Sequence, residues 1–242
     1  MNGDDVPLPE YDFINGATLL VDKPEGWTSF DVVNKIRYRL KHRLKVKKIK
    51  VGHAGTLDPM ATGLLIICTG KATKKLHTMQ GLDKTYTGTI TLGATTPSYD
   101  QETAIDETFP IDHIDADLIE QTRKDFIGEL SQVPPMFSAI KVDGQPLYKK
   151  ARKGQSVEVQ PRKVVIYSFD ITSIDIPAVD FKVSCSKGTY IRSLANDFGK
   201  ALQSGAYLSA LRRTRIGSFH IEDAWNLESL IEFLEMSPIK EE

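Results

Sequence analysis

A glycine-rich stretch of thirteen residues, Val51 to Gly63, constrains the fold of this chain more than any other part of the sequence. Its three glycines admit backbone conformations closed to other residues and allow a partner to approach closely. Within it, Pro59 fixes its own φ and disfavours helix at Asp58, the residue before it. The apolar run Leu64 to Cys68 follows at once. We therefore expect Asp58 on a rigid, non-helical turn that leads into a buried strand.

Asp58 is a candidate for chemistry, because reactive groups are often carried on loops that a rigid scaffold holds. An isolated Asp-Pro pair is more often a simple turn. Here glycines lie on both sides of the carboxylate, and an imidazole, His53, lies five residues upstream. This combination favours a reactive loop over a plain turn.

Patterns along the rest of the chain predict an α+β fold with a mixed, largely antiparallel sheet. Helices are expected at residues 29–40, 71–79, 116–127, 147–153, 189–202 and 225–234, with the strongest helical period in 189–202. Strands are expected at residues 18–22, 64–68, 84–92, 164–174, 179–186 and 207–221. Ser29 and Thr189 are predicted to cap the helices that follow them.

Three parts of unequal size are expected. Residues 1–16 are predicted to be a flexible arm, residues 17–221 one main domain, and residues 222–242 a short acidic helix and tail. Within the main domain, residues 96–112 form an acidic connector, and residues 132–154 are rich in Pro, Gly and Lys. We expect residues 132–154 to project as a flap with few core contacts.

The net charge of −1 conceals a strong segregation of charge. Residues 35–50 hold nine Lys or Arg and no acid, and residues 141–163 and 182–215 hold seven basic residues each. The acids gather at residues 4–31, 100–129 and 222–242. Such segregation predicts a basic face and an acidic back, and it favours a polyanionic partner over a merely solvated surface.

Several classes of protein are disfavoured. No apolar run approaches the ~20 residues of a membrane span, and the acidic N-terminus lacks the pattern of a secretory signal. Cys68 and Cys185 lie in apolar runs outside any zinc spacing, as expected for buried thiols in a reducing compartment. The sequence contains no P-loop, no convincing dinucleotide fingerprint and no His/Cys ligand cluster. We therefore expect a cytoplasmic protein with no metal and no cofactor.

The glycine-rich stretch also resembles a known family. Residues Gly52 to Gly63 are similar to the catalytic motif of the TruB family of tRNA pseudouridine synthases. Five further matches follow in the order of that family: Val21-Asp22-Lys23-Pro24, Lys84-Thr85-Tyr86, Pro134 to Ala139, Lys187 to Arg192, and Leu211-Arg212-Arg213. The resemblance runs from about Thr18 to about Ile221. It implies the pseudouridine synthase fold, in which a mixed sheet carries the site in a central RNA-binding cleft.

The resemblance implies an isomerase that converts uridine 55 in the TΨC arm of tRNA to pseudouridine after the target base has flipped out of its stack. We expect a monomer that needs no small-molecule cofactor and has no contact with membranes, although the sequence itself does not fix the oligomeric state. The implied catalytic residues are Asp58, Tyr86 and Arg192. The implied substrate-binding residues are His53, Tyr190, Leu211 and Lys23, although support behind the catalytic loop is the safer role for Lys23.

The implied roles differ in how far the residues themselves support them. Asp58 would either attack C1′ of the ribose or abstract a ribose proton, and the sequence leaves both open. Tyr86 would stack on the target base near C5, whereas the residues alone suggest a core aromatic of a strand. Arg192 would pair with the catalytic carboxylate, which agrees with its otherwise unfavourable place near a helix N-terminus. His53 would help to displace the nucleotide, or would simply bond a backbone carbonyl.

Two other functions remain open at this point. A non-catalytic RNA-binding or RNA-folding protein on the same scaffold explains the basic blocks equally well, but it would not need Asp58, Tyr86 and Arg192 together. A glycoside hydrolase normally needs two carboxylates that flank the scissile bond, and the motif offers one.

The C-terminal end of the chain departs from many members of the family. Many bacterial members continue into a small RNA-binding PUA domain, and this chain reaches Glu242 too soon after His220 for an ordinary one. We therefore expect the RNA contacts of that domain to be missing or replaced.

Overall fold

The computed structural model of the chain describes residues 10–138, 140–142, 144–155 and 157–236. The strands are β1 (Thr18–Lys23), β2 (Val51–His53), β3 (Thr62–Thr69), β4 (Lys84–Leu92), β5 (Ala94–Thr95), β6 (Glu107–Thr108), β7 (Gly128–Gln132), β8 (Lys141–Val142), β9 (Gln145–Pro146), β10 (Arg162–Asp175), β11 (Ala178–Cys185), β12 (Ala206–Ile216), β13 (Phe219–His220) and β14 (Trp225–Asn226). The helices are α1 (Ser29–Arg43), α2 (Leu76–Gln80), α3 (Ala116–Lys124), α4 (Leu147–Ala151), α5 (Ile191–Ala201) and α6 (Leu227–Met236), with 3-10 turns η1 (Gly70–Lys75) and η2 (Ile221–Asp223).

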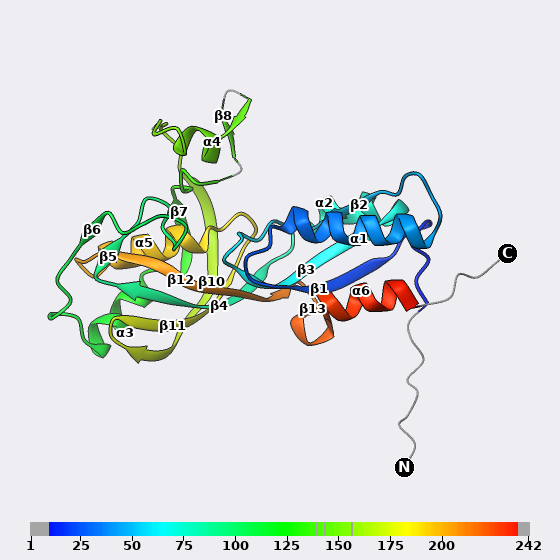
Figure 1. The fold of residues 1–242 in the computed structure, drawn as a ribbon. Helices are drawn as coiled ribbons and strands as arrows, with labels where there is room; N and C mark the ends of the chain where they lie inside the picture. Colours follow the sequence, from blue (N-terminus) through cyan, green and yellow to red (C-terminus); the bar gives the residue numbers. More distant parts are fainter. Residues whose placement is uncertain (1–9, 139, 143, 156, 237–242) are drawn as a thin grey trace, which may run out of the picture.

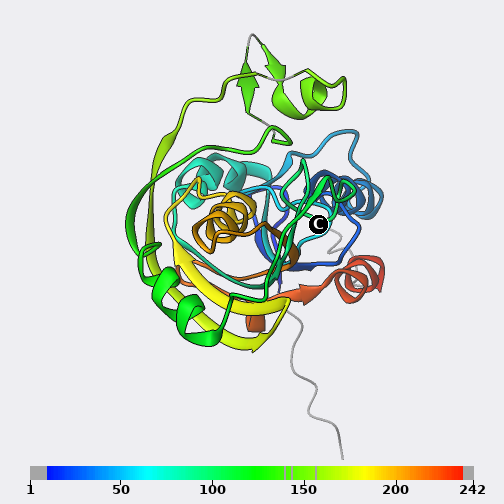
Figure 2. The ribbon, with the colours of Figure 1, turned by 90° about the vertical axis from the view of Figure 1, so that its left-hand side faces the viewer.

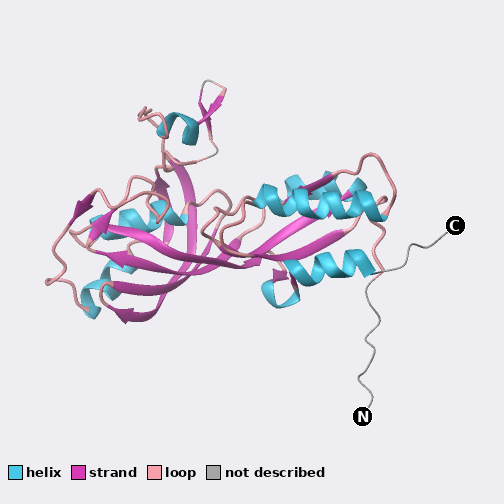
Figure 3. Cartoon of the chain, in the orientation of Figure 1, coloured by secondary structure: helices cyan, strands magenta, loops and turns pink. Residues whose placement is uncertain are grey.

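One long sheet runs through both halves of the molecule (Figures 1 and 3) in the order β14-β1-β3-β12-β4-β11-β10-β7. Strand β2 pairs with β3, and β13 pairs with β12, off this path. Most neighbours are antiparallel, whereas β14 with β1 and β12 with β3 are parallel. The predicted α+β class with a mixed, largely antiparallel sheet is therefore confirmed.

Strands β3 and β12 join the two halves of the sheet through two residue pairs, Arg212 with Thr62 and Arg213 with Gly63. Gly63 has a φ of +103°, and an added Cβ would lie 2.3 Å from the carbonyl oxygen of Arg213, so this close approach requires glycine. Strand β3 begins soon after the turn that carries Asp58. The glycine-rich loop is thereby placed where the two halves meet (Figure 1).

The second lobe contains β4, β7, β10, β11 and most of β12, with α3 and α5 packed against them (Figure 1). Its core centres on Phe169, whose ring lies 5.5 Å from that of Phe198 and 5.9 Å from that of Phe181, both edge to face. Helix α5 supplies Leu194, Ala195 and Phe198 to this core, as its strong helical period predicted.

The first lobe is built on β1 and β3. Helices α1 and α6 share one buried cluster with β1, to which they contribute Ile36, Leu40, Leu230 and Leu234. The other face of β3 packs against η1 and α2. The expected helix at residues 225–234 therefore begins two residues late, because Trp225 and Asn226 pair with β1 as strand β14.

The expected flexible arm at residues 1–16 includes residues 1–9, which lie outside the described residues. The described remainder is packed against the first lobe. Phe13 is buried, its ring lies 5.5 Å from that of Tyr11, and its carbonyl oxygen accepts a hydrogen bond from Thr69 Oγ1. This part of the expected arm is therefore anchored, because an aromatic side chain gains most of its stabilisation when it is buried.

Residues 132–154 leave the end of β7 and form the hairpin β8–β9 and helix α4, which project from the main sheet (Figure 1). Figure 2 shows the same segment standing above the rest of the ribbon. Within its described part, Leu147 is buried, and so are Gln132, Pro134, Pro135 and Ser138.

Both predicted helix caps were wrong by one residue. Helix α1 is capped by Thr28, which exchanges hydrogen bonds with Asp31 in a capping box. Helix α5 has Tyr190 at its N-cap without a side-chain cap, and Thr189 Oγ1 instead donates to the carbonyl oxygen of Ser186.

Candidate active site

The loop that carries Asp58 is held on its N-terminal side by a hydroxyl. Because Thr28 caps α1, Ser29 is free to accept a hydrogen bond from the backbone N–H of Leu57 at 2.9 Å and to donate to its carbonyl oxygen at 3.2 Å. Ser29 is buried, so these bonds are not exchanged with water. The residue before Asp58 is thereby fixed in place.

The residue after Asp58 is held by an ammonium. Lys23 is fully buried, and its Nζ donates to the carbonyl oxygens of Trp27 at 2.6 Å, Pro24 at 2.9 Å and Pro59 at 3.3 Å. Burial lowers the pKa of Lys23 to about 8, and the negative charge of Asp58 opposes that shift. With three backbone carbonyl oxygens as acceptors and no exposed surface, Lys23 is placed to support the loop.

Arg213 holds both ends of the loop. Its side chain is 1% exposed, its Nε donates to the carbonyl oxygen of Leu64 at 2.8 Å, and its Nη2 donates to that of Gly55 at 3.1 Å. From the sequence, Arg213 was expected only as part of the motif Leu211-Arg212-Arg213. The alternation of side chains along β12 was the available signal for its burial. It places Arg213 on the same face of the strand as the buried Leu211.

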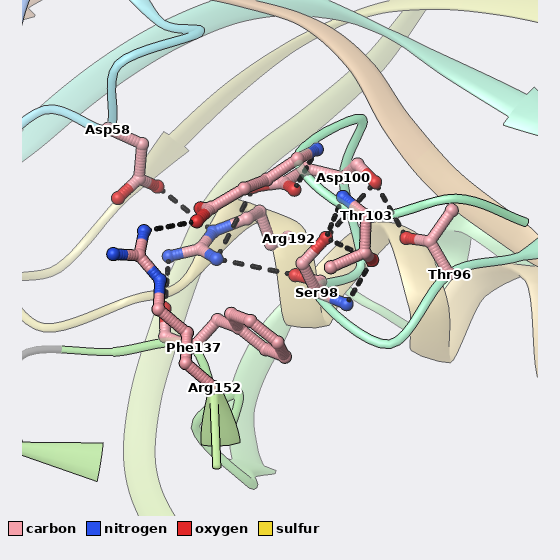
Figure 4. Close-up of polar contacts among 9 residues, drawn as sticks. Asp58, Thr96, Ser98, Asp100, Thr103, Phe137, Arg152 and Arg192 are labelled. Atoms are coloured by element: carbon pink, nitrogen blue, oxygen red, sulfur yellow. Dashed lines mark hydrogen bonds and ion pairs between the residues drawn. The ribbon is translucent and has the colours of Figure 1, made fainter. Parts of the chain in front are cut away.

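Asp58 and Arg192 form an ion pair, with Arg192 Nε 2.9 Å from Asp58 Oδ2 (Figure 4). The Arg192 side chain is 4% exposed and that of Asp58 is 35% exposed. Desolvation raises the pKa of Asp58 above its usual range, the positive charge of Arg192 opposes this rise, and the negative charges of Asp100 and Glu102 add to it. The pairing of Asp58 and Arg192 expected from the sequence is present in the structure.

The guanidinium of Arg192 is fixed by three further groups. Its Nη1 lies 3.3 Å from Asp100 Oδ2 and donates to the carbonyl oxygen of Ser98 at 3.3 Å, and its Nη2 donates to that of Phe137 at 3.0 Å (Figure 4). Asp100 is 1% exposed. The buried cation is thus shared between two carboxylates, which satisfies a charge that would be costly without partners.

Asp100 lies on a loop that closes on itself. The Thr96 Oγ1 donates to the carbonyl oxygen of Asp100 at 2.6 Å, the backbone N–H of Glu102 donates to Asp100 Oδ1 at 2.8 Å, and the hydroxyls of Ser98 and Thr103 lie 2.8 Å apart (Figure 4). From the sequence, this loop was expected only as part of an acidic connector, and Asp100 was not among the candidate site residues. A dense run of Ser, Thr and Asp was the available signal, because these side chains readily bond the nearby backbone.

The flap touches the same loop. Arg152, just after α4, lies with its Nη2 2.7 Å from Glu102 Oε1. Figure 4 shows Arg152 close to the pair of Asp58 and Arg192. The base of the flap is tied to α5, because Gln132 accepts from the N–H of Tyr190 at 2.8 Å and donates to its carbonyl oxygen at 3.1 Å.

Two aromatic candidates lie near the ion pair. Tyr86 on β4 is 8% exposed and shares a buried cluster with Leu57 and Leu211. Burial raises the pKa of Tyr86, and the charge of Arg213 opposes this. Burial also raises the pKa of Tyr190, and the guanidinium of Arg162, 5.8 Å from the ring centroid, opposes it.

His53 is less closely connected to this centre. It lies on β2 opposite Ile67, is partly buried, and has a pKa lowered chiefly by burial. Within the described part of the chain, no hydrogen bond or ion pair joins its side chain to Asp58, Tyr86 or Arg192.

The described residues contain no group of three or more His, Cys, Asp or Glu side chains that could hold a metal ion. None of the described helices is both long enough and apolar enough to span a bilayer.

Two family models cover most of the chain. Residues 41–191 match the model of the "TruB family pseudouridylate synthase (N terminal domain)", and residues 192–241 match the "tRNA pseudouridylate synthase B C-terminal domain". The chain is 56% identical over 225 residues to the tRNA pseudouridine synthase B of Flavobacterium johnsoniae. The matched region covers 93% of this chain and 98% of that protein. It is 51% identical over 229 residues to the protein of the same name from Parabacteroides distasonis. That match covers 95% of this chain and 97% of the other protein.

Solved structures give the same fold. A chain in the crystal structure of a Cbf5-Nop10-Gar1 complex superposes with a TM-score of 0.69 at 32% identity, over 91% of this chain and 55% of that one. A chain in the structure of an H/ACA RNP bound to a substrate RNA containing 2'-deoxyuridine gives a TM-score of 0.65 at 30% identity. The superposition covers 90% of this chain and 53% of that one. The present chain spans about half the length of these solved chains.

Proposed function

The chain belongs to the TruB family of pseudouridylate synthases, and from that membership we propose that it is a tRNA pseudouridine synthase that isomerises uridine 55 in the TΨC arm. The relatives of similar length carry the name tRNA pseudouridine synthase B. The observation that carries the proposal is the ion pair of Asp58 with Arg192, because it offers one partly exposed carboxylate on a loop held from both sides. We further propose that the enzyme acts as a cytoplasmic monomer without a cofactor.

The reaction is an internal rearrangement of one nucleotide. The glycosidic bond between N1 and C1′ breaks, the uracil turns, its C5 joins C1′, and the proton on C5 leaves to a base while N1 regains one. No other reactant is consumed. Asp58 either attacks C1′ as a nucleophile or removes a ribose proton, and both roles require the carboxylate form.

Arg192 keeps Asp58 charged and oriented. When the target nucleotide covers the 35% of the Asp58 side chain that is exposed, the loss of water favours the protonated, inert acid. The guanidinium at 2.9 Å opposes that change and directs the carboxylate toward the substrate. Asp100 holds Arg192 from the buried side and is proposed as a positioning residue.

Tyr86, Tyr190 and Leu211 are proposed to bind the flipped base. A uridine in folded RNA must leave its stack before C1′ can be reached, at a cost of a few kcal/mol. Stacking on an aromatic side chain recovers roughly 1–3 kcal/mol per base. Tyr86 would lie near C5 and Leu211 would supply an apolar contact. His53 would help to displace the nucleotide, and Lys23 supports the loop.

The proposal is tested by incubating the protein with an unmodified tRNA transcript and mapping pseudouridine, free uracil and binding in one experiment. Pseudouridine at position 55 supports the isomerase, and a transcript with cytidine at that position is the matched control. Release of free uracil would indicate a hydrolase instead. Binding without either product would indicate an RNA-binding protein on the same scaffold.

A further inference from the structure

A groove of about 310 Å³ lies between the loop that follows α1 and the turn η1. Lys48 and Lys50 line it from the loop, and Lys71 and Lys74 line it from η1. All four lysines are exposed, and none of the described residues that line the groove is acidic. We call this site the lysine groove. A concave site with four ammonium groups is a strong local source of positive potential on a chain whose net charge is −1.

The two walls of the lysine groove are joined by the backbone. The N–H of Gly70 donates to the carbonyl oxygen of Lys50 at 2.9 Å, which ties η1 to the loop. Gly70 has a φ of +49°, and an added Cβ would lie 2.1 Å from the carbonyl oxygen of Ile14. Lys71 is further tied to Asn15 by a hydrogen bond of 2.9 Å. The spacing of the walls is therefore set before any ligand arrives.

The lysine groove lies at the other end of β3 from the candidate active site. Strand β3 has eight residues, so Thr62 near Asp58 and Thr69 beside the groove are roughly 23 Å apart at about 3.3 Å per residue. That separation exceeds the size of one nucleotide. A ligand that occupied both places would have to be an extended molecule.

Charge is distributed unevenly between the two sides of the first lobe. In Figures 1 and 2, α1, α2 and the flap lie on the upper side, whereas α6 lies on the lower side. The exposed basic residues of α1, η1 and α2 include Lys41, Lys74, Lys75 and His77. The exposed residues of α6 include Glu228, Glu232 and Glu235. An extended polyanion that enters the site beneath the flap therefore meets positive charge along the upper side.

We propose that the lysine groove is a second RNA contact, which binds phosphates of the same RNA whose uridine reaches Asp58, several nucleotides away from it. The inference rests on the proposed function. Lysine ammonium groups bind phosphates as point charges and do not read sequence. The remaining lining includes the aliphatic side chains of Val46 and Ile49, which offer no hydrogen bonds to base edges. The contact thus depends on the length of the RNA and not on its sequence.

The test compares two RNAs and two triple variants. The groove variant is Lys48→Gln, Lys50→Gln and Lys74→Gln, and it keeps Lys71 because that side chain bonds Asn15. The matched control is Lys124→Gln, Lys182→Gln and Lys200→Gln, which removes the same charge from exposed sites on α3, β11 and α5. The RNAs are the full-length tRNA transcript and a minimal hairpin of the target loop with its closing base pairs. Affinity is measured over a range of salt concentrations.

The groove variant is expected to bind full-length tRNA about tenfold more weakly, with a salt slope reduced by roughly 0.7–0.9 for each phosphate that the protein no longer neutralises. Its affinity for the minimal hairpin, its single-turnover rate at saturating tRNA and the affinities of the control variant are expected to be unchanged. If the affinity of the groove variant for full-length tRNA depends on salt as steeply as that of the wild type, the inference is overturned. Equal weakening on both RNAs, or equal weakening in the control variant, would overturn it as well, because either result indicates a diffuse charge effect.

The two proposals fail in different ways. If the wild-type protein binds tRNA but forms no pseudouridine, the proposed function fails, and the comparison of affinities still decides whether the lysine groove contacts RNA.

Discussion

Arg192 approaches Asp58 from the buried side: its Nε lies 2.9 Å from Asp58 Oδ2, and the two side chains are 4% and 35% exposed. The exposed part of the carboxylate therefore remains open to a substrate while the cation behind it does not. The same guanidinium contacts Asp100, which is 1% exposed. One buried cation thus pairs with two carboxylates, of which only Asp58 is partly exposed.

Replacing Asp58 by asparagine keeps the shape of the side chain and removes its charge. Turnover of tRNA is expected to vanish, because neither attack nor proton abstraction is open to an amide. Affinity for tRNA is expected to stay within about tenfold, which is about 1.4 kcal/mol. Single-turnover assays and filter binding check this, with the exposed Asp117→Asn as the control. Substantial pseudouridine formation by Asp58→Asn would contradict the assignment.

Replacing Arg192 by alanine is expected to shift the pH dependence of turnover toward alkaline pH. Arg192 lowers a pKa that burial has raised, so its loss raises the pKa of Asp58 further and delays formation of the reactive carboxylate as pH increases. Arg192→Lys keeps the charge and loses the planar fork, so its shift should be smaller. Single-turnover rates against pH at saturating tRNA measure both. A loss of rate with no alkaline recovery would refute this role.

Replacing Asp100 by asparagine is expected to shift the pH dependence of turnover toward acidic pH. The negative charge of Asp100 raises the pKa of Asp58, so its removal lets Asp58 ionise at lower pH. The maximal rate should nevertheless fall, because Arg192 loses a charged partner on its buried side. Asp106→Asn, an exposed substitution on the same connector, is the matched control. An alkaline shift would show that Asp100 does not act through charge.

Arg213→Lys is expected to weaken both stability and turnover. Lysine cannot reach the carbonyl oxygens of Gly55 and Leu64 together, and a buried acceptor left without a donor costs about 1–3 kcal/mol. Chemical denaturation measures the first effect and single-turnover assays the second. Arg212→Lys, on the opposite face of β12, changes a partly exposed ion pair with Asp22 and should cost about 0–1 kcal/mol. Equal effects of the two variants would count against the loop-holding role of Arg213.

Lys23→Met is expected to change how stability depends on pH. Because the pKa of Lys23 is lowered to about 8 in the folded protein, the unfolded chain binds more protons at position 23 between about pH 8 and pH 10.5. The wild type should therefore gain stability relative to Lys23→Met as pH rises through that window. Denaturant unfolding at several pH values measures the difference. The exposed Lys47→Met is the matched control for the loss of one lysine, and a flat curve for Lys23→Met would mean that its pKa is ordinary.

Much of the fold followed from local patterns. The glycines and Pro59 predicted a rigid turn at Asp58, and the apolar run after it predicted the buried strand β3. The helical period of residues 189–202 predicted α5 and its packing face. These predictions succeeded because they depend on neighbours in sequence, which the sequence displays directly.

Other parts depend on contacts between distant segments. Thr28 and Ser29 are both good capping residues. Which of them caps α1 depends on Leu57, whose backbone N–H and carbonyl oxygen form hydrogen bonds with the Ser29 hydroxyl. Asp100 matters because its loop folds against Arg192, which lies far along the chain. No local pattern encodes the distances between such groups, so the contacts of Ser29 with Leu57 and of Asp100 with Arg192 could not be predicted from the sequence.

The shared core of α1, β1 and α6 has a consequence for how the chain is made. Leu230 and Leu234 of α6 complete the buried cluster around Leu19 and Ile36. The first lobe is therefore completed by a segment that is synthesised after the whole of the second lobe. During synthesis its apolar face stays open while the second lobe can already fold from contiguous sequence, so the nascent first lobe is the part exposed to aggregation and to chaperones.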